Sequence, residues 1–398
     1  MTKQLQDAWI VAATRTPVGK APRGAFKSTR PDTLLAHVLK SVLAQVPAID
    51  PGRVEDVIVG CAMPEFEQGM NVARIGVLLA GLPASVAGMT VNRFCSSGLN
   101  AVSIAADRIR TGEADIVIAA GTESMSMIPM LGRLALNEAV FAHGENVGIA
   151  YGMGLTAEKV AAQWKISREA QDAFALESHR RALAAQAAGE FAQEISQFTV
   201  HEDLPDLAAD RIVTREKAIA HDEGPRADTT PEGLAKLRPV FAAKGSVTAG
   251  NSSQMSDGAG ATVLVSERVL RELSLVPLAR WVGFAVAGVP PEIMGIGPIV
   301  AIPKVLARTG IRKEDLDWIE LNEAFAAQAL AVMQDLDLDP AKVNPLGGAI
   351  ALGHPLGATG AIRTATITHG LRRRGGKYGM VSMCVGTGMG AAGIFEAA

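Results

Sequence analysis

The sequence predicts an α/β protein made of two similar halves with an insertion between them. Three observations lead to this prediction. Short apolar runs alternate with helical patterns, a weak internal repeat relates the two ends of the chain, and the strand pattern lapses in between. Several of the runs are uninterrupted, which is typical of strands that are buried on both faces by helices.

Seven short runs rich in β-branched and apolar residues are predicted to be strands, namely AWIVAAT, VEDVIVGCA, ADIVIAAG, ATVLVSE, ARWVGFAVAG, DLDWIELN and YGMVSMCVG. Four longer stretches carry apolar residues at helical spacing and are predicted to be helices, namely 32–46, 99–110, 168–188 and 362–374. Strands and helices therefore alternate over most of the chain.

The internal repeat relates a strand–helix–strand unit in each half. DVIVG around Ile58 precedes Gly98 by 40 residues, and DWIEL around Ile319 precedes Gly360 by 41. We interpret this as two copies of one unit that face each other, with functional residues on the loops where they meet. A chance likeness between two βα units is the alternative.

The repeat also suggests domain boundaries. We predict an N-terminal half from residues 1–124 and 251–274, an inserted domain from 125–250, and a C-terminal half from 275–398. The insertion is rich in Met, Ala, charged helical segments and Gly/Pro turns, and long insertions of this kind are often binding lids.

Composition excludes several classes of protein. The chain has 398 residues, more than one core usually supports, and a net charge of −3 with no basic cluster beyond 372–374, so nucleic acid is not an expected partner. The three cysteines have no disulfide or metal-ligand spacing, which favours a reducing compartment and no bound metal. The N-terminus has no apolar segment and no apolar stretch is long enough to span a bilayer, so we expect a cytoplasmic protein without membrane insertion.

Cys95 is the first candidate functional residue. It lies in VNRFCSSGLNA, between a short apolar run and small residues that open an amphipathic helix. Backbone N–H groups and the positive end of the helix dipole favour a thiolate there, so we expect a depressed pKa and a reactive nucleophile. A buried structural cysteine is the alternative.

Two further candidates lie in the C-terminal half. His354 stands in the glycine-rich segment NPLGGAIALGHPLGATG, where an imidazole can approach a ligand closely and act as a general base near neutral pH. Cys384 ends an apolar strand before CVGTGMG and could exchange a proton with a substrate carbon, or simply fill the core. For Cys61 core packing is favoured, because no polar or glycine-rich context surrounds it.

Asn322 and Glu323 stand at a strand-to-helix junction in ELNEAFAAQ. Asparagine there could be a helix N-cap, or it could hold a water or polarise a carbonyl oxygen. KGSVTAGNSSQMSDGA combines small and hydroxyl residues before a buried strand, which fits either a cluster of turns or a surface against a long, thin ligand.

With these residues in place, the chain resembles the thiolases, the family of acyl-CoA C-acyltransferases, over nearly its whole length. NRFCSSGLNA, GNSSQMSDGA, NEAFAAQ, GGAIALGHPLGATG and CVGTGMG occur in the family's order and spacing. The resemblance implies a five-layered αβαβα core of two similar halves. It also implies an inserted loop domain that binds coenzyme A, which is a substrate and not a permanently bound cofactor.

The resemblance also implies roles for the residues. Cys95 would accept the acyl group from a 3-ketoacyl-CoA, His354 would take its proton, and Cys384 would protonate the departing carbanion. Asn322 would hold a water beside the thioester enolate oxygen, while backbone N–H groups of Cys95 and Gly386 would form the other oxyanion hole. A second CoA would then collect the acyl chain, which gives ping-pong kinetics.

For CoA, the family pattern implies contacts from six side chains of this sequence: Arg226, Phe241, Ser253, Met153, Met294 and Phe325. The first three would contact the nucleotide and pantetheine, and the last three would line the pantetheine and acyl tunnel. Gly233 stands where many relatives have serine.

Subclass is inferred from one segment. YGMGLTAEKVA has Gly152 before Met153, where short-chain biosynthetic relatives typically carry histidine, so the chain resembles the degradative 3-ketoacyl-CoA thiolases. A biosynthetic acetoacetyl-CoA thiolase and a non-catalytic acyl-CoA or lipid carrier on the same scaffold are the alternatives.

The resemblance also implies a homodimer or homotetramer, with enzymes of β-oxidation as possible partners. ADIVIAAG is an apolar edge that could pair across a two-fold axis.

Overall fold

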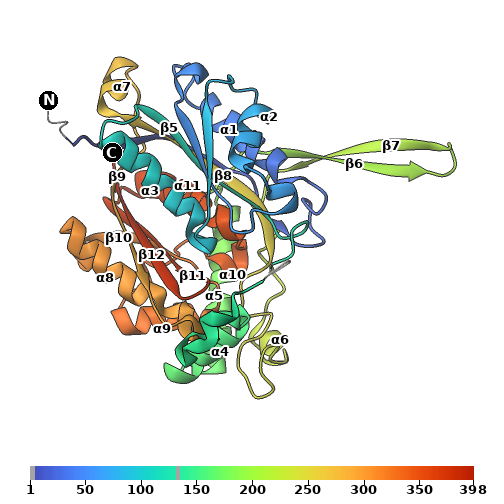
Figure 1. Ribbon diagram of the computed structural model, residues 1–398. Helices are drawn as coiled ribbons and strands as arrows, with labels where there is room; N and C mark the ends of the chain where they lie inside the picture. Colours follow the sequence, from blue (N-terminus) through green and yellow to red (C-terminus); the bar gives the residue numbers. More distant parts are fainter. Residues whose placement is uncertain (1–4, 131–134) are drawn as a thin grey trace.

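Two half-sheets with helices around them form the body of the molecule, and one long hairpin projects from it (Figure 1). The computed structural model describes residues 5–130 and 135–398. Among these residues, no helix has the length and apolar character needed to cross a membrane.

The N-terminal half-sheet has the strand order β1-β8-β5-β3-β4, with the short β2 beside β8. Its strands are β1 (Ala8–Arg15), β2 (Gly19–Lys20), β3 (Asp56–Gly60), β4 (Ala87–Val91), β5 (Ile116–Ser124) and β8 (Ser256–Ser266). β3 is parallel to β4 and β5, whereas β8 is antiparallel to β1 and β5. Every residue of β3, β5 and β8 is buried, as expected for strands covered on both faces.

The C-terminal half-sheet has the order β10-β11-β12-β9. Its strands are β9 (Ala279–Gly288), β10 (Leu316–Leu321), β11 (Tyr378–Val385) and β12 (Met389–Ala397). β10 and β11 are parallel, and the other pairs are antiparallel. β9 also pairs with β1, but only through Trp9–Arg280 and Ile10–Ala279, so the two half-sheets are joined at one short seam.

Two helices lie between the half-sheets. α3 (Ser97–Arg110) and α11 (Leu356–Arg374) contact each other and strands of both halves. α1 (Pro31–Ala44) and α2 (Val72–Leu79) cover the outer face of the first half-sheet. α8 (Gly297–Thr309) covers the outer face of the second half-sheet, and α9 (Ala326–Leu336) packs against α8. The layers are therefore αβαβα, as the resemblance implied. Separate apolar clusters fill the spaces between them.

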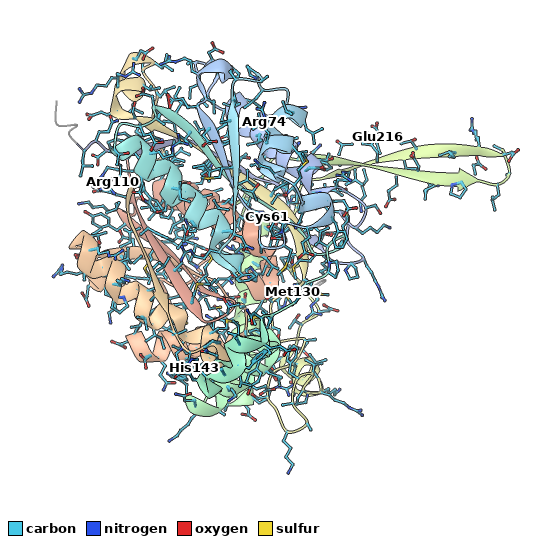
Figure 2. The ribbon with its side chains drawn as sticks, viewed as in Figure 1. Cys61, Arg74, Arg110, Met130, His143 and Glu216 are labelled. Carbon is cyan, nitrogen blue, oxygen red and sulfur yellow. The ribbon has the colours of Figure 1, made fainter. Side chains whose placement is uncertain are left out.

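The segment between β5 and β8 contains α4 (Met153–Gln163), α5 (Arg168–Ala187) and α6 (Pro231–Ala235). The expected absence of strands from this segment was wrong, because β6 (Phe198–Asp206) and β7 (Arg211–Ile219) form the projecting hairpin. Figure 2 labels Glu216 on it. Most hairpin residues are exposed or half-buried, so they carry no apolar run that the sequence analysis could detect.

All seven predicted strands are present, and the four predicted helices correspond to α1, α3, α5 and α11. β4 and β12 were missed, since β4 is short and β12 consists largely of small residues. The suggestion that ADIVIAAG forms an edge was wrong: β5 lies between β8 and β3, and the ends of the sheet are β4 and β10.

Candidate active site

Cys95 lies in a tight turn between β4 and α3. The turn spans Phe94–Ser96, and Phe94 has a φ of +43°, a strained value for a bulky residue. The Ser97 hydroxyl accepts from Arg93 N at 2.8 Å and donates to Phe94 O at 2.7 Å, which holds the turn in place. The turn packs against both α11 and β11, so Cys95 of the first half lies against elements of the second.

The pKa of the Cys95 thiol is raised, whereas the sequence analysis predicted that it would be depressed. Burial raises it to about 11, although backbone N–H groups of Gly386 and of Cys95 itself oppose this rise by hydrogen bonding to the sulfur. The prediction considered only the local helix end, whereas the desolvation comes from packing with the other half. Cys95 is therefore a thiol at neutral pH and needs a base.

Cys384 lies near the end of β11 and has no exposed surface. Burial raises the pKa of its thiol well above the usual value, and the neighbouring Cys95 adds to this effect. The Cys95 sulfur, which comes from the other half, is thus close enough to influence the ionisation of Cys384. Cys384 carries its proton at neutral pH, as a donor to a carbanion must.

His354 directly precedes Pro355 and α11, and only 4% of its surface is exposed. Its Nδ1 lies 2.7 Å from Thr359 Oγ1, and its Nε2 lies 3.3 Å from Asn322 Nδ2. Because an amide N–H only donates, Nε2 is the accepting nitrogen and Nδ1–H donates to Thr359. Burial, with a contribution from the Arg363 charge, lowers the pKa of His354 to about 3, so the imidazole is neutral.

Asn322 follows β10, and its backbone N–H donates to Ser382 O at 2.9 Å. This places it two residues along β11 from Cys384. Its side-chain oxygen is buried and has no hydrogen-bond partner among the described residues. The N-cap alternative was wrong, because α9 begins only at Ala326 with Phe325 as its N-cap. The free oxygen is available to a water or a substrate group.

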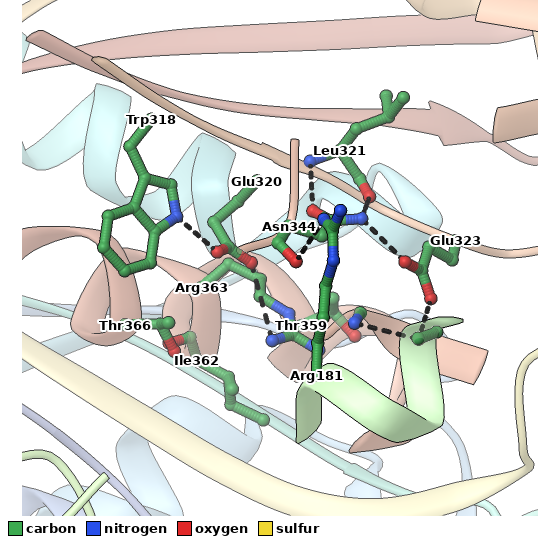
Figure 3. Close-up of polar contacts among 12 residues, drawn as sticks. Arg181, Trp318, Glu320, Leu321, Glu323, Asn344, Thr359, Ile362, Arg363 and Thr366 are labelled. Carbon is green, nitrogen blue, oxygen red and sulfur yellow. Dashed lines mark hydrogen bonds and ion pairs between the residues drawn. The ribbon is translucent and has the colours of Figure 1, made fainter. Parts of the chain in front are cut away.

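A buried polar network supports the strand end that carries Asn322 (Figure 3). Glu320 accepts from Trp318 Nε1 at 2.7 Å and lies 3.5 Å from Arg363 Nη1. Glu323 accepts from Ser178 Oγ, Asn344 Nδ2 and Ile350 N. These bonds connect β10, α11 and α5, so the position of Asn322 is fixed from several elements.

Cys95 lies on the wall of a cavity of about 310 Å³. Most lining residues are apolar, and they come from the loop after β3, the turn before α3, the segment before α4 and the two glycine-rich loops of the C-terminal half: Ala62, Met63, Pro64, Glu65, Asn92, Phe94, Met130, Leu136, Ile149, Ala150, Tyr151, Met153, Leu356, Gly386 and Thr387. Met130 is labelled in Figure 2. The cavity is of a kind that accepts an apolar ligand next to the Cys95 thiol.

The side chains expected to contact CoA fall into two groups. Met153, Met294 and Phe325 pack in one apolar cluster with Cys384. Phe241 stacks edge-on against Phe325 with a centroid distance of 6.1 Å. Only Met153 of these also lines the cavity around Cys95.

Ser253 and Arg226 lie outside that cavity. Ser253 N donates to Ala324 O at 2.9 Å, which places Ser253 beside the apolar cluster. The exposed Arg226 donates its backbone N–H to His179 Nδ1 at 3.2 Å.

The sequence analysis missed Thr359, Arg363 and Glu123. Thr359 and Arg363 follow His354 within GHPLGATGAIR, so their place in the same glycine-rich segment could have indicated them. Glu123 is the penultimate residue of β5 and is buried, and nothing in the local sequence indicates that burial.

Comparison with known proteins agrees with this geometry. The family model "Thiolase, N-terminal domain" matches residues 8–268, and "Thiolase, C-terminal domain" matches residues 275–397. The chain is 47% identical over 394 residues to a 3-ketoacyl-CoA thiolase of Bacillus subtilis, covering 98% of this chain and all of that one. It is 46% identical over 391 residues to the peroxisomal 3-ketoacyl-CoA thiolase A of Mus musculus, covering 98% and 91%.

Two solved structures share the fold over almost the full chain. The acetyl-CoA acetyltransferase of Bacillus anthracis superposes with a TM-score of 0.91 at 42% identity, covering 100% of both chains. The human mitochondrial 3-ketoacyl-CoA thiolase superposes with a TM-score of 0.87 at 38% identity, covering 99% of both. Together with the two family models, these similarities show that the chain belongs to the thiolase family.

Proposed function

We propose that this thiolase cleaves 3-ketoacyl-CoA with CoA, giving acetyl-CoA and a shortened acyl-CoA. The observation that carries the proposal is the approach of Cys95 in one half to Cys384 in the other. The turn that carries Cys95 also contacts α11, which begins two residues after His354, and His354 in turn lies against Asn322. The 3-ketoacyl-CoA thiolases among the similar proteins support the degradative direction. Gly152 in front of Met153 supports the same direction.

In the first half-reaction, His354 Nε2 takes the Cys95 proton and the sulfur attacks the C3 carbonyl carbon. The C2–C3 bond then breaks, and its electron pair passes to C2 as the enolate of acetyl-CoA. Cys384 donates its proton to C2, and acetyl-CoA leaves. The acyl chain remains as a thioester on Cys95.

In the second half-reaction, a new CoA thiol loses its proton to the Cys384 thiolate and attacks the thioester carbonyl. The acyl-CoA product leaves, and the Cys95 sulfur recovers its proton from His354. Both cysteines end in the state in which they began, so no further reactant is needed.

Two sets of donors would stabilise the oxygen anions. The N–H groups of Gly386 and Cys95 point at the Cys95 sulfur and would serve the tetrahedral oxygen that forms there. His354 would serve the enolate oxygen together with a water, which the unpartnered Asn322 oxygen would hold. Removal of one such donor typically costs a factor of about 10²–10³ in rate.

We assign CoA to the side of the site formed by Met153, Met294 and Phe325, with Phe241 and Ser253 along the pantetheine and Arg226 near the nucleotide. The apolar cluster beside Cys384 supports the first three positions. CoA is treated as a substrate, with no permanently bound cofactor. The loop domain at 125–250 that supplies several of these residues also belongs to the proposal.

We further infer a homodimer or homotetramer in a reducing, cytoplasmic compartment, where enzymes of β-oxidation supply the substrate. All three cysteines are free, which fits a reducing environment. β4 is an edge strand with an exposed Met89, and exposed Leu78 and Leu79 lie on the neighbouring α2. An edge of this kind supports strand pairing with a second copy.

A biosynthetic acetoacetyl-CoA thiolase is the second candidate, favoured by the similarity to the acetyl-CoA acetyltransferase of Bacillus anthracis. The deciding assay follows CoA-dependent loss of 3-ketoacyl-CoA absorbance across acyl chain lengths. Cleavage of long chains with a kcat/KM above that for acetoacetyl-CoA supports the proposal. Activity on acetoacetyl-CoA alone supports the second candidate, and loss of substrate without CoA would indicate a hydrolase.

Two variants separate the half-reactions. Cys95→Ser should form no acyl-enzyme detectable by intact-protein mass spectrometry. Cys384→Ala should still be acylated by a simple acyl-CoA but should cleave 3-ketoacyl-CoA at least about 10²-fold more slowly, because the C2 carbanion lacks its proton donor. Thiolysis by Cys384→Ala at the wild-type rate would remove this cysteine from the mechanism.

A further inference from the structure

Glu123 is a buried acid that the proposed mechanism does not use. It is the penultimate residue of β5, next to the cavity wall, and only 1% of its surface is exposed. None of the ion pairs among the described residues includes it, so no cation compensates its charge. A buried carboxyl group of this kind is costly unless hydrogen bonds hold it.

Four N–H donors hold the carboxylate. Oε2 accepts from Ala62 N at 2.8 Å and Gly357 N at 2.9 Å, while Oε1 accepts from Gln68 Nε2 at 2.6 Å and Met63 N at 3.2 Å. Burial raises the pKa of Glu123, and the four donors oppose that rise. Because every one of these contacts supplies a hydrogen, the geometry suits the charged form.

These donors belong to segments that build the site. Ala62 and Met63 line the cavity around Cys95, and Gly357 follows Leu356, which also lines it. Gly357 is in the first turn of α11, three residues after His354. A Cβ at Gly357 would lie 2.6 Å from Ala62 N and 2.8 Å from Glu123 Oε2, so the three segments meet in direct contact.

The charge of Glu123 also acts on two thiols. After burial, it contributes to the raised pKa of Cys61 and, more weakly, of Cys95. Cys61 packs in the core, as predicted, and its Sγ also lies 3.9 Å from Glu123 Oε1 and 3.4 Å from Gln68 Nε2. The other titratable groups around the Cys95 turn are Cys384 on β11, Glu65 and Tyr151 on the cavity wall, and the neutral His354 just before α11, the helix that the turn contacts.

We propose that Glu123 is a positioning residue of the thiolytic site, which clamps the loop after β3 to the start of α11 and places a negative charge behind Cys95. Burial keeps the resting cysteine protonated and the charge of Glu123 adds to this effect. The hydrogen bonds of Glu123 set the distance between the loop after β3 and the helix that follows His354. The inference rests on the proposed role of Cys95 as nucleophile.

The test is the pH dependence of Cys95 alkylation by iodoacetamide, followed by mass spectrometry of the Cys95 peptide. Glu123→Gln removes the charge with little change in size. The midpoint of the plot of Cys95 alkylation rate against pH should therefore move to lower pH, and at pH values below the wild-type midpoint Cys95 should react several-fold faster than in the wild type. The kcat for thiolysis should fall about tenfold or more, because the amide NH₂ cannot accept from the donors it faces. Alkylation needs no acyl-CoA, so this result stands even if thiolysis is not the reaction.

Glu223→Gln is the matched control. Glu223 is also held by backbone N–H groups, those of Lys20 and Ala25, but it is not among the groups that act on Cys95. It should leave the alkylation profile unchanged even if stability falls. An alkylation profile for Glu123→Gln that coincides with those of Glu223→Gln and the wild type would overturn the proposal.

Glu123→Asp covers the case in which Glu123→Gln does not fold. The shorter acid keeps the charge but cannot reach all four donors, so kcat should fall while the alkylation inflection stays near that of the wild type. A kcat for Glu123→Asp equal to the wild-type value would also overturn the proposal.

Discussion

Burial holds Cys95 and His354 in their neutral forms. The pKa of the thiol rises to about 11 and that of the imidazole falls to about 3. The ion pair that the proposed mechanism forms between them must therefore be stabilised by groups that act on the reacting state, such as the N–H groups of Cys95 and Gly386. Stabilisation of this kind lowers the free energy of the transition state relative to that of the resting enzyme.

The depressed pKa of His354 predicts a dependence of stability on pH. The unfolded chain binds a proton at this residue below a pKa of about 6.5, whereas the folded chain binds it only near 3. Stability from this group is therefore present above about pH 6.5 and is lost as the pH falls toward 3, by up to about 1.4 kcal/mol per pH unit.

His354→Gln should reduce the slope of the unfolding free energy between about pH 6 and pH 4, measured by urea denaturation at several pH values. Identical slopes for His354→Gln and the wild type would contradict the assigned burial of the imidazole.

At the scale of elements, the central layer depends on the close approach of α3 and α11. A Cβ at Gly98 would lie 2.6 Å from Ala361 N, and a Cβ at Gly360 would lie 2.1 Å from Leu99 N. The two helices therefore meet backbone to backbone, next to the turn that carries Cys95. Their glycines are required by this contact, since neither has a positive φ.

Gly360→Ala should lower the free energy of unfolding by about 1–3 kcal/mol or more, because the added methyl group displaces one backbone from the other. The measurement is the urea midpoint. Gly144→Ala provides the comparison, since a Cβ there would have no atom within 4 Å. Equal midpoints for the two variants would show that the helices separate freely.

At the scale of the whole molecule, the single short seam between β1 and β9 lets the two half-sheets face each other across α3 and α11. Cys95 and Cys384 come from opposite halves, and the hairpin β6–β7 projects away from the two half-sheets (Figure 1). The division into residues 1–124 with 251–274, 125–250 and 275–398 stays a prediction. The proposed homodimer can be tested at β4.

Met89→Glu should convert a dimer into a monomer in sedimentation velocity at micromolar concentration. A charge in the middle of an edge strand opposes pairing with a second copy. Val276→Glu, which changes another exposed apolar residue away from β4, should sediment like the wild type. If the Met89→Glu protein sediments like Val276→Glu, the dimer interface does not include β4.

The sequence by itself determined the class of fold and the seven main strands, and it predicted the candidate segments around Cys95, His354 and Cys384. It could do so because apolar periodicity and glycine-rich turns are local properties of the chain. The tertiary structure alone decided the sign of the Cys95 pKa shift and the burial of Glu123. It also decided that β5 is an interior strand. These features depend on desolvation and contact between segments far apart in the sequence, which no local pattern contains.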